Sequence, residues 1–190
     1  AKNHYFMRHA NHEGKLYSLT VQTLPSSGSD NNSGGGSGGG SGSGSSDKYV
    51  PDSAIVEKGG EVKVTLTGSS TKISAAQLKK LITKNEDKAI VFSGPDYTIT
   101  FASGSMKTAA GQTGLDLGLK TGRDAGGLNL PNADAANLAL VLSFKHSGAL
   151  PGEAAVRVKA GSSYAGQTLH YYYYNESTDQ LEYRQSAEAD

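Results

Sequence analysis

The sequence predicts a mainly β protein, an antiparallel β-sandwich that carries one short helix. About eight short stretches between residues 61 and 185 have the patterning of strands, and turn-forming residues separate them. The chain is rich in glycine, at 25 of 190 residues, and its aromatic residues are ten tyrosines and four phenylalanines without tryptophan. Only one stretch has a clear amphipathic helix pattern. This combination is typical of turn-rich β structure rather than of a helical bundle.

The strands are predicted from alternation of apolar and polar residues. In residues 61–67, Val62, Val64 and Leu66 alternate with polar side chains, which is typical of a strand with one solvated face. Residues 88–92 and 97–101 flank the turn "SGPD" and are predicted to form a hairpin. Further strands are expected at 115–121, 137–144, 154–160, 168–174 and 180–185, and the last two flank "NESTD", a loop of hairpin length.

The one well-supported helix is predicted over residues 74–84. Ser74 and Gln77 have the spacing of a capping box, in which each residue's side chain bonds the other's backbone. Leu78, Leu81 and Ile82 then form one apolar stripe that the sheet can cover. A second, weaker helix is expected near residues 105–110.

A Gly/Ser-rich stretch divides the chain into three parts. Eighteen of the residues from 26 to 46 are Gly or Ser, so this stretch cannot bury apolar surface and is predicted to be a flexible linker over 26–47. Residues 1–25 are expected to contain one strand, at 15–24. That strand is either the tail of a preceding module or a strand that completes the sandwich. Residues 48–190 are expected to form the sandwich module itself.

Composition argues against several classes of function. Lys and Arg together number 18, as do Asp and Glu, so no excess of positive charge indicates a nucleic-acid partner. Cysteine is absent, which excludes disulfides, thiolate metal sites and cysteine nucleophiles. No apolar run has the ~18 residues that a membrane helix needs. We therefore expect no cofactor and no membrane insertion, with any export signal lying outside these residues.

Arg8 and His9 follow an apolar stretch in "HYFMRHANHEGK", which resembles the start of the histidine phosphatase family. That resemblance implies phosphate binding by Arg8, phosphoryl transfer through His9 and a second histidine role for His146. Such an enzyme needs a parallel α/β sheet, whereas the chain is predicted to form antiparallel strands beyond a flexible linker. We therefore expect no enzymatic activity, and a phosphatase is the remote alternative.

Two stretches have residues that metal sites use. His4, His9 and His12 supply imidazoles near the start of the chain, but no acidic residue or cysteine is fixed beside them. The stretch "TGRDAGGLN" at 121–129 has the glycine and aspartate content of a calcium loop without its ligand spacing. Solvated histidines and a plain loop are the preferred interpretations, so no metal site is expected.

The tyrosines of "HYYYYNESTDQLEYRQ" leave two interpretations open. In a strand, Tyr171 and Tyr173 face one way with Leu169, while Tyr172 and Tyr174 face the other way with His170. Tyrosine is a favoured strand residue, so these rings can simply fill the sheet. Alternatively, the second set forms a stripe that stacks on a glycan or a peptide. The candidate ligand-binding residues of that stripe are Tyr172, Tyr174, Tyr183 and His170.

Four stretches in this order resemble a family of modules in large surface proteins of Gram-positive, mostly gut-dwelling, bacteria. They are the linker "SGGGSGGGSGSGSSD", the capped helix "KISAAQLKKLI", the paired strands "AIVFSGPDYTITF" and the closing block "GEAAVRVKAGSSYAGQTLHYYYYNESTDQLEYRQ". The resemblance covers roughly residues 33 to 190. In that family, a further strand usually follows the tyrosine-rich hairpin.

This resemblance implies an immunoglobulin-like, noncatalytic module of an extracellular protein that is attached to the cell wall or S-layer, often near S-layer homology domains. We expect it to space or present adjacent domains, and so to act as a structural or adhesion module. Its expected partners are the neighbouring domains of the same surface protein. A host or cell-wall glycan or protein is the further partner if the tyrosine stripe binds a ligand.

Overall fold

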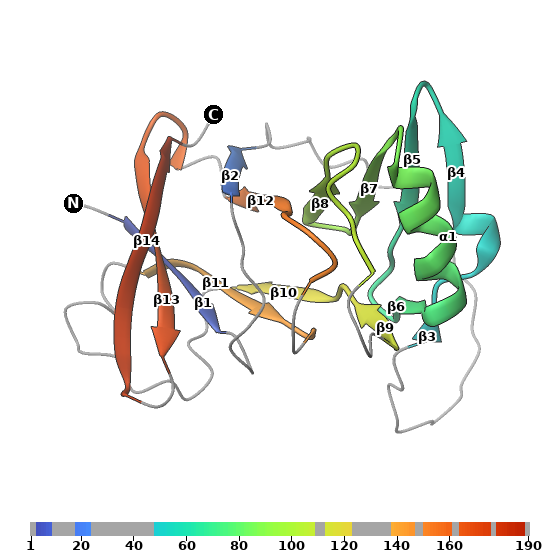
Figure 1. The fold of residues 1–190 in the computed structure, drawn as a ribbon. Coiled ribbons are helices and arrows are strands. Elements are labelled where there is room, and N and C mark those ends of the chain that lie inside the picture. The colour runs from blue at the N-terminus through green and yellow to red at the C-terminus, as the bar shows by residue number, and fades with distance from the viewer. Residues whose placement is uncertain are drawn as a thin grey trace, which may run out of the picture.

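The computed structural model describes residues 3–8, 18–23, 48–108, 113–122, 138–146, 150–160, 164–175 and 178–188. For residues 3–8 and 18–23 it describes the backbone alone. The stretch from 24 to 47, which contains the expected linker, lies outside the described residues. The described part is mainly β, with one α-helix and several sheets (Figure 1), an arrangement consistent with a β-sandwich.

The described residues form three sheets. The five-stranded sheet has the order β10-β11-β1-β13-β14, with bounds Leu119–Gly122, Leu138–Phe144, Asn3–Arg8, Thr168–Asn175 and Gln180–Glu188. The six-stranded sheet has the order β2-β12-β8-β7-β5-β4, with bounds Ser18–Thr23, Ala155–Ala160, Tyr97–Phe101, Ala89–Ser93, Glu61–Thr65 and Ile55–Lys58. The three-stranded sheet has the order β3-β6-β9, with bounds Lys48–Tyr49, Ser70–Ser74 and Gly114–Asp116. Figure 1 shows β13 and β14 at one end of the molecule and α1 (Ala75–Asn85) with β4 at the other.

Several predicted elements are confirmed. Val62 and Val64 of β5 are fully buried while their neighbours in the strand are exposed, as the alternation predicts. β7 and β8 pair antiparallel as the expected hairpin, and so do β13 and β14. β11 and β12 lie within a residue of their predicted bounds.

The capping box begins the helix as predicted. The Ser74 backbone N–H donates to Gln77 Oε1 at 3.0 Å, and the Gln77 N–H donates to Ser74 Oγ at 3.2 Å. Leu78 and Leu81 are buried, so the apolar stripe faces the core. The second helix expected near 105–110 is not formed at residues 105–108, and residues 109–112 lie outside the described part.

The expectation that the strands run only antiparallel is wrong. β5 pairs with β7 in parallel, β12 with β2, and β3 with β6. Parallel neighbours need a crossover connection, and β6 with α1 supplies it between β5 and β7. Alternation of apolar residues reports which face of a strand is buried, and it carries no information about strand direction.

The segment before the linker contains two strands rather than the one expected. β2 falls within the predicted stretch and pairs with β12 at the edge of the six-stranded sheet. β1, at Asn3–Arg8, lies between β11 and β13 and is parallel to both. The apolar residues of this stretch suit a central strand, whose backbone groups are bonded along both edges.

The single strand expected at 115–121 is two short strands in two different sheets. β9 belongs to the three-stranded sheet and β10 to the five-stranded sheet, with Leu117 and Gly118 between them. A Cβ atom at Gly118 would lie 2.6 Å from Lys145 Cδ, so a larger residue here would have to displace the Lys145 side chain. The alternating leucines conceal this change of sheet because each of them still reaches apolar surroundings.

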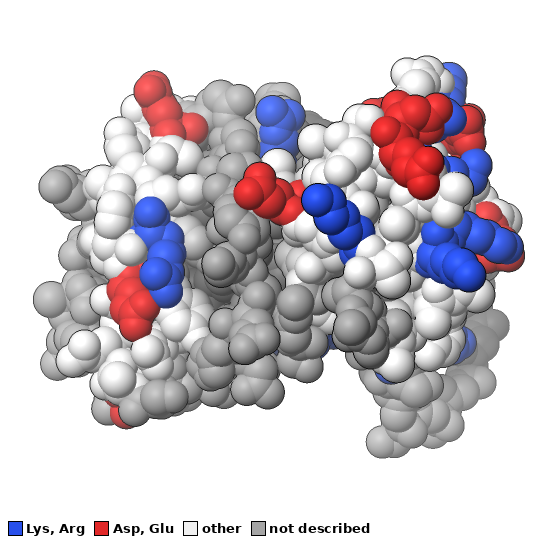
Figure 2. All heavy atoms as spheres, viewed as in Figure 1, with Lys and Arg blue, Asp and Glu red and all other residues white. Residues whose placement is uncertain are grey.

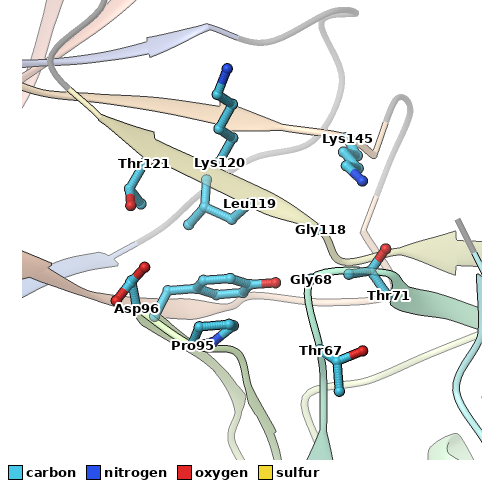
Figure 3. A pocket seen from close by; sticks show the side chains of 11 residues that line it. Thr67, Gly68, Thr71, Pro95, Asp96, Gly118, Leu119, Lys120, Thr121 and Lys145 are labelled. Carbon is cyan, nitrogen blue, oxygen red and sulfur yellow. The ribbon is translucent and has the colours of Figure 1, made fainter. Parts of the chain in front are cut away.

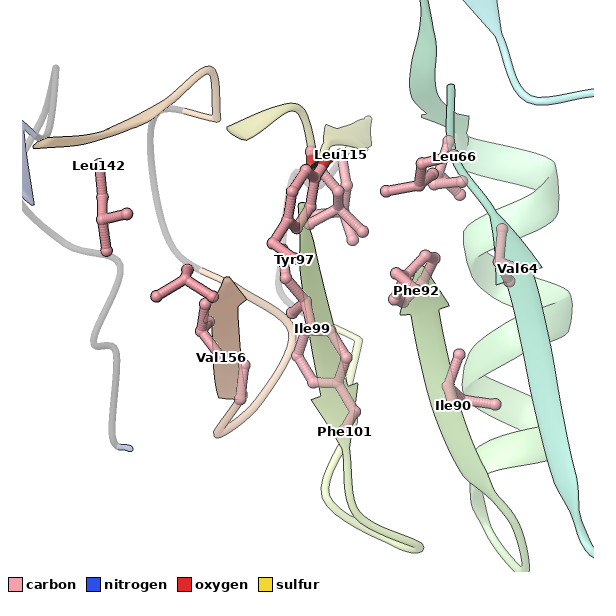
Figure 4. Close-up of a cluster of buried hydrophobic side chains, with 14 of the residues drawn as sticks. Val64, Leu66, Ile90, Phe92, Tyr97, Ile99, Phe101, Leu115, Leu142 and Val156 are labelled. Atoms are coloured by element: carbon pink, nitrogen blue, oxygen red, sulfur yellow. Dashed lines mark hydrogen bonds between the residues drawn. The ribbon is translucent and has the colours of Figure 1, made fainter. Parts of the chain in front are cut away.

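The core is built around the central strands of the six-stranded sheet (Figure 4). Phe92 and Phe101 are fully buried and meet edge to face, with ring centroids 6.0 Å apart. Tyr97 is also buried, and its hydroxyl donates to the Leu117 carbonyl at 2.7 Å. This hydrogen bond ties the six-stranded sheet to the segment between β9 and β10. Burial raises the pKa of Tyr97 to about 12.

The raised pKa of Tyr97 predicts a loss of stability at alkaline pH. Because the unfolded chain ionises this tyrosine near its ordinary pKa of about 10, the free energy of unfolding falls as pH rises from about 10 towards 12. Tyr97→Phe should reduce that alkaline loss. It should also lower the free energy of unfolding at pH 7 by ~1–2 kcal/mol, since the Leu117 carbonyl loses its donor. Urea unfolding across this pH range measures both changes.

The control for Tyr97→Phe is Tyr49→Phe, which removes a hydroxyl from a tyrosine that is 64% exposed. Tyr49→Phe should change neither the loss of stability at alkaline pH nor the free energy of unfolding at pH 7. Equal alkaline slopes in Tyr97→Phe and the unsubstituted chain would contradict the role given to burial.

Candidate functional site

The sequence-predicted tyrosines lie on the antiparallel hairpin of β13 and β14, whose register contains an irregularity. Tyr172 pairs with Tyr183, but Tyr171 pairs with Gln185, so Arg184 is an extra residue on β14. Without this bulge, Tyr183 and Ser186 would point to opposite faces, because they are three residues apart. With it, both share a face with Tyr172 and His170. We call His170, Tyr172, Tyr183 and Ser186 the aromatic face.

The side chains of the aromatic face contact one another. The rings of Tyr172 and Tyr183 meet edge to face with centroids 5.7 Å apart, and His170 lies 6.3 Å from the Tyr183 ring. Ser186 Oγ is hydrogen-bonded to His170 Nδ1 at 2.6 Å and to the Tyr183 hydroxyl at 2.8 Å. Tyr183 is 56% exposed, whereas His170 and Tyr172 are half-buried. The arrangement holds one exposed tyrosine ring in a fixed position.

The other face of the hairpin belongs to the core, as the alternation predicts. Leu169, Tyr171 and Tyr173 are all buried. Burial raises the pKa of Tyr171, so its hydroxyl stays neutral. The Arg184 guanidinium lies 5.2 Å from the centre of the Tyr173 ring and is also paired with Glu182 at 2.7 Å.

Tyr174 is a candidate ligand-binding residue that the structure does not bring to the exposed surface. Only 2% of it is accessible, and its hydroxyl donates to Asp179 Oδ1 at 2.6 Å. Asp179 has a φ of 51°, a left-handed conformation that aspartate tolerates in turns. Tyr174 thus anchors the hairpin turn, and three of the four candidate residues, Tyr172, Tyr183 and His170, come together on the aromatic face.

The phosphatase-like stretch begins in a parallel part of the five-stranded sheet. Arg8 of β1 pairs with Ser143 of β11 and with Tyr174, all in parallel register. The end of β1 at Arg8 therefore lies at the same end of the sheet as the end of β11 at Phe144, two residues before His146. The strands around Arg8 are thus parallel, not antiparallel as expected. His9 and His12 lie outside the described residues.

Among the residues that the structure describes, no group of three or more His, Asp and Glu side chains is placed to hold a metal ion. Most of the calcium-like stretch at 121–129 lies outside this part, as do the side chains near the start of the chain. No described helix combines the length and apolar character needed to cross a membrane.

Comparison with protein-family models, with curated proteins and with solved structures finds no match to this chain.

Sequence reasoning missed Ser186 and Arg184. Ser186 holds the two polar ends of the aromatic face together, and Arg184 is the bulge residue that brings Tyr183 and Ser186 to one side. A strand in this region could be predicted from the alternation of apolar and polar residues. The bulge could not, because one extra residue in a paired strand does not alter the alternation within β14 itself. Its only signal is the register of both strands taken together.

The different burial of two tyrosines predicts different costs of truncation. Tyr174→Ala should lower the free energy of unfolding by ~3–5 kcal/mol, because it removes a buried ring and leaves Asp179 without its donor. Tyr183→Ala should cost less than ~1 kcal/mol, since more than half of its surface is exposed. Urea unfolding of both variants measures the difference. Similar losses in the two variants would contradict the placement of these rings.

Proposed function

We propose that this chain is a noncatalytic module of an exported bacterial surface protein. It presents the end that carries α1 and β4, which lies away from the points where the rest of the protein is attached. The observation that supports this most directly is the register of the five-stranded sheet. Asn3, the first residue of β1, lies beside Leu169 of β13, and Leu169 lies opposite Ala187, near the end of β14. The chain therefore enters β1 and leaves β14 at the same end of one sheet.

This geometry favours presentation over simple spacing. β13 alone separates β1 from β14, so the points where the chain enters and leaves are roughly 10 Å apart. Any domain joined before Asn3 or after Glu188 would be attached at this end. A spacer that lengthens a stalk is better served by attachment points at opposite ends of the module. In Figure 1, β1 and β14 lie on the side of the molecule opposite to α1 and β4.

The presented end carries a charged surface. Figure 2 shows Lys, Asp and Glu side chains gathered over α1 and β4. Glu57 of β4 is paired with Lys84 of α1 at 2.6 Å and with Lys88 at 3.2 Å. The hydrogen bond from Lys84 lowers the pKa of the Glu57 carboxyl. Exposed pairs of this kind add little stability, so their contribution is to a hydrated, soluble surface.

Labelling on intact cells tests the proposal, and because these 190 residues contain no natural cysteine, a label within them can only be on an introduced one. The parent protein is produced in its own host with Lys80→Cys, an exposed position on α1, and treated with a membrane-impermeant maleimide. The peptide containing residue 80 should be labelled before lysis. Its control is Val64→Cys, a buried position that should react only after unfolding. Labelling of the Lys80→Cys variant that occurs only after lysis would contradict export and presentation.

A second candidate function is supported by the aromatic face: recognition of a glycan or a peptide. A tyrosine that is 56% exposed and held by Tyr172 and Ser186 offers a ring for stacking that is already ordered. If this face binds a ligand, an array of mucin-type glycans and peptides should show saturable binding that Tyr183→Ala weakens by about tenfold or more. Tyr49→Ala, which removes another exposed tyrosine, should leave it unchanged. Equal effects of the two substitutions would reject this face as the site.

A further inference from the structure

A pocket of about 360 Å³ lies where four segments of the chain converge (Figure 3). The connection from β5 to β6 and the turn from β7 to β8 form one side, while the segment from Gly118 to Thr121 and Lys145 form the other. Its rim is exposed at Thr67, Asp96 and Lys145, whereas Thr71 and Tyr97 in its wall are buried. The pocket thus opens to solvent, and its volume is at the small end of the ~300–1,000 Å³ typical of ligand sites.

Hydrogen bonds fix the β7–β8 side of the pocket. Lys159 of β12 donates from Nζ to the Pro95 carbonyl at 2.7 Å and from its backbone N–H to the Asp96 carbonyl at 2.9 Å. The Tyr97 hydroxyl donates to the Leu117 carbonyl, which joins this side to the opposite one. A Cβ atom at Gly94 would overlap the Tyr97 ring, so glycine is needed for the ring to lie there.

The opposite side is held as firmly. Asp116 Oδ1 accepts from Thr71 Oγ1 at 2.7 Å and from the Gly118 N–H at 3.1 Å. The Lys145 N–H donates to the Gly118 carbonyl at 2.9 Å. These bonds connect β6, β9 and the end of β11 before any ligand arrives. A site whose walls are already ordered loses little conformational entropy on binding.

The rim offers both acceptors and donors. The Asp96 carboxylate and the Thr121 hydroxyl make no hydrogen bond or ion pair with the part of the chain that the structure describes. Thr67 Oγ1 accepts from the Ser70 N–H at 3.0 Å, so its own proton can still be donated. Beside these polar groups, Leu119 and Pro95 supply apolar surface. A ligand with hydroxyl groups around a compact C–H surface matches this combination.

The charges around the pocket favour a neutral ligand. Lys145 is on the rim, but Asp96 lines the same pocket and Asp116 lies directly behind Thr71 and Gly118. Lys120 extends its ammonium group away from the hollow in Figure 3. An anion would therefore meet carboxylates as well as one ammonium group, and its desolvation would not be repaid.

We propose that this pocket binds a neutral sugar of one or two rings, with Asp96 and Thr121 bonding its hydroxyl groups and Leu119 and Pro95 packing on its C–H face. The site shares no residue with the aromatic face of the hairpin. Sugar binding in this pocket is therefore independent of the presentation function and of ligand binding by Tyr183.

An NMR titration of the whole chain tests this. The probes are the methyl glycosides of glucose, galactose, mannose and N-acetylglucosamine at millimolar concentration, with glucuronic acid as an anionic comparison. At least one neutral glycoside should shift the amide signals of Gly118 and Thr121 in a saturable way. Asp96→Ala should weaken that binding by about tenfold or more, and Thr121→Val by about threefold or more.

The matched control is Asp87→Ala, which removes a carboxylate that is 73% exposed and lies outside the pocket. It should bind the glycoside as the unsubstituted chain does, and so should Tyr183→Ala. The proposal is overturned if none of the neutral glycosides shifts these signals, or if Asp96→Ala binds as tightly as Asp87→Ala. It is equally overturned if only glucuronic acid binds and Lys120→Ala abolishes that binding.

Discussion

The pairing of β1 along both of its edges is the constraint on which the arrangement of this chain depends. β11 and β13 are separated by β1 and are joined only through it, because the described strands contain no pairing between them. Removing β1 would divide the five-stranded sheet into the pair β10–β11 and the hairpin β13–β14. A two-stranded hairpin alone is at best marginally stable in water. The first residues of the chain are thus a structural part of the module that follows the Gly/Ser stretch.

The same pairing supports the proposed function. It brings the start of β1 and the end of β14 to one end of the sheet, while β12, β8, β7 and β5 carry the fold away towards α1. The pocket lies among β5, β6, β8 and β10, and the aromatic face lies on the hairpin beside the points of attachment. Two candidate binding surfaces of different chemistry are thereby placed on one module. One offers an exposed ring, and the other offers a hollow with polar groups.

Prediction from the sequence succeeded where the signal is local. The alternation around Val62 and Val64 and the capping box of Ser74 and Gln77 specify burial and a helix start from a few neighbouring residues. Strand direction, the division at Gly118 and the bulge at Arg184 depend on partners far along the chain, so no local pattern reports them. Of the candidate ligand residues, Tyr174 lies buried with its hydroxyl bonded to Asp179, a contact made only when the turn forms.

Amide hydrogen exchange of Phe6→Pro tests the central claim most directly. Phe6 pairs with both Val141 and Tyr172, and proline in a central strand removes a backbone donor. The account predicts that this substitution reduces protection across 138–144 and 168–175 together, and leaves 61–65 and 89–93 protected as before. Unchanged protection of 138–144 and 168–175 would contradict it, because the five-stranded sheet would then not depend on β1.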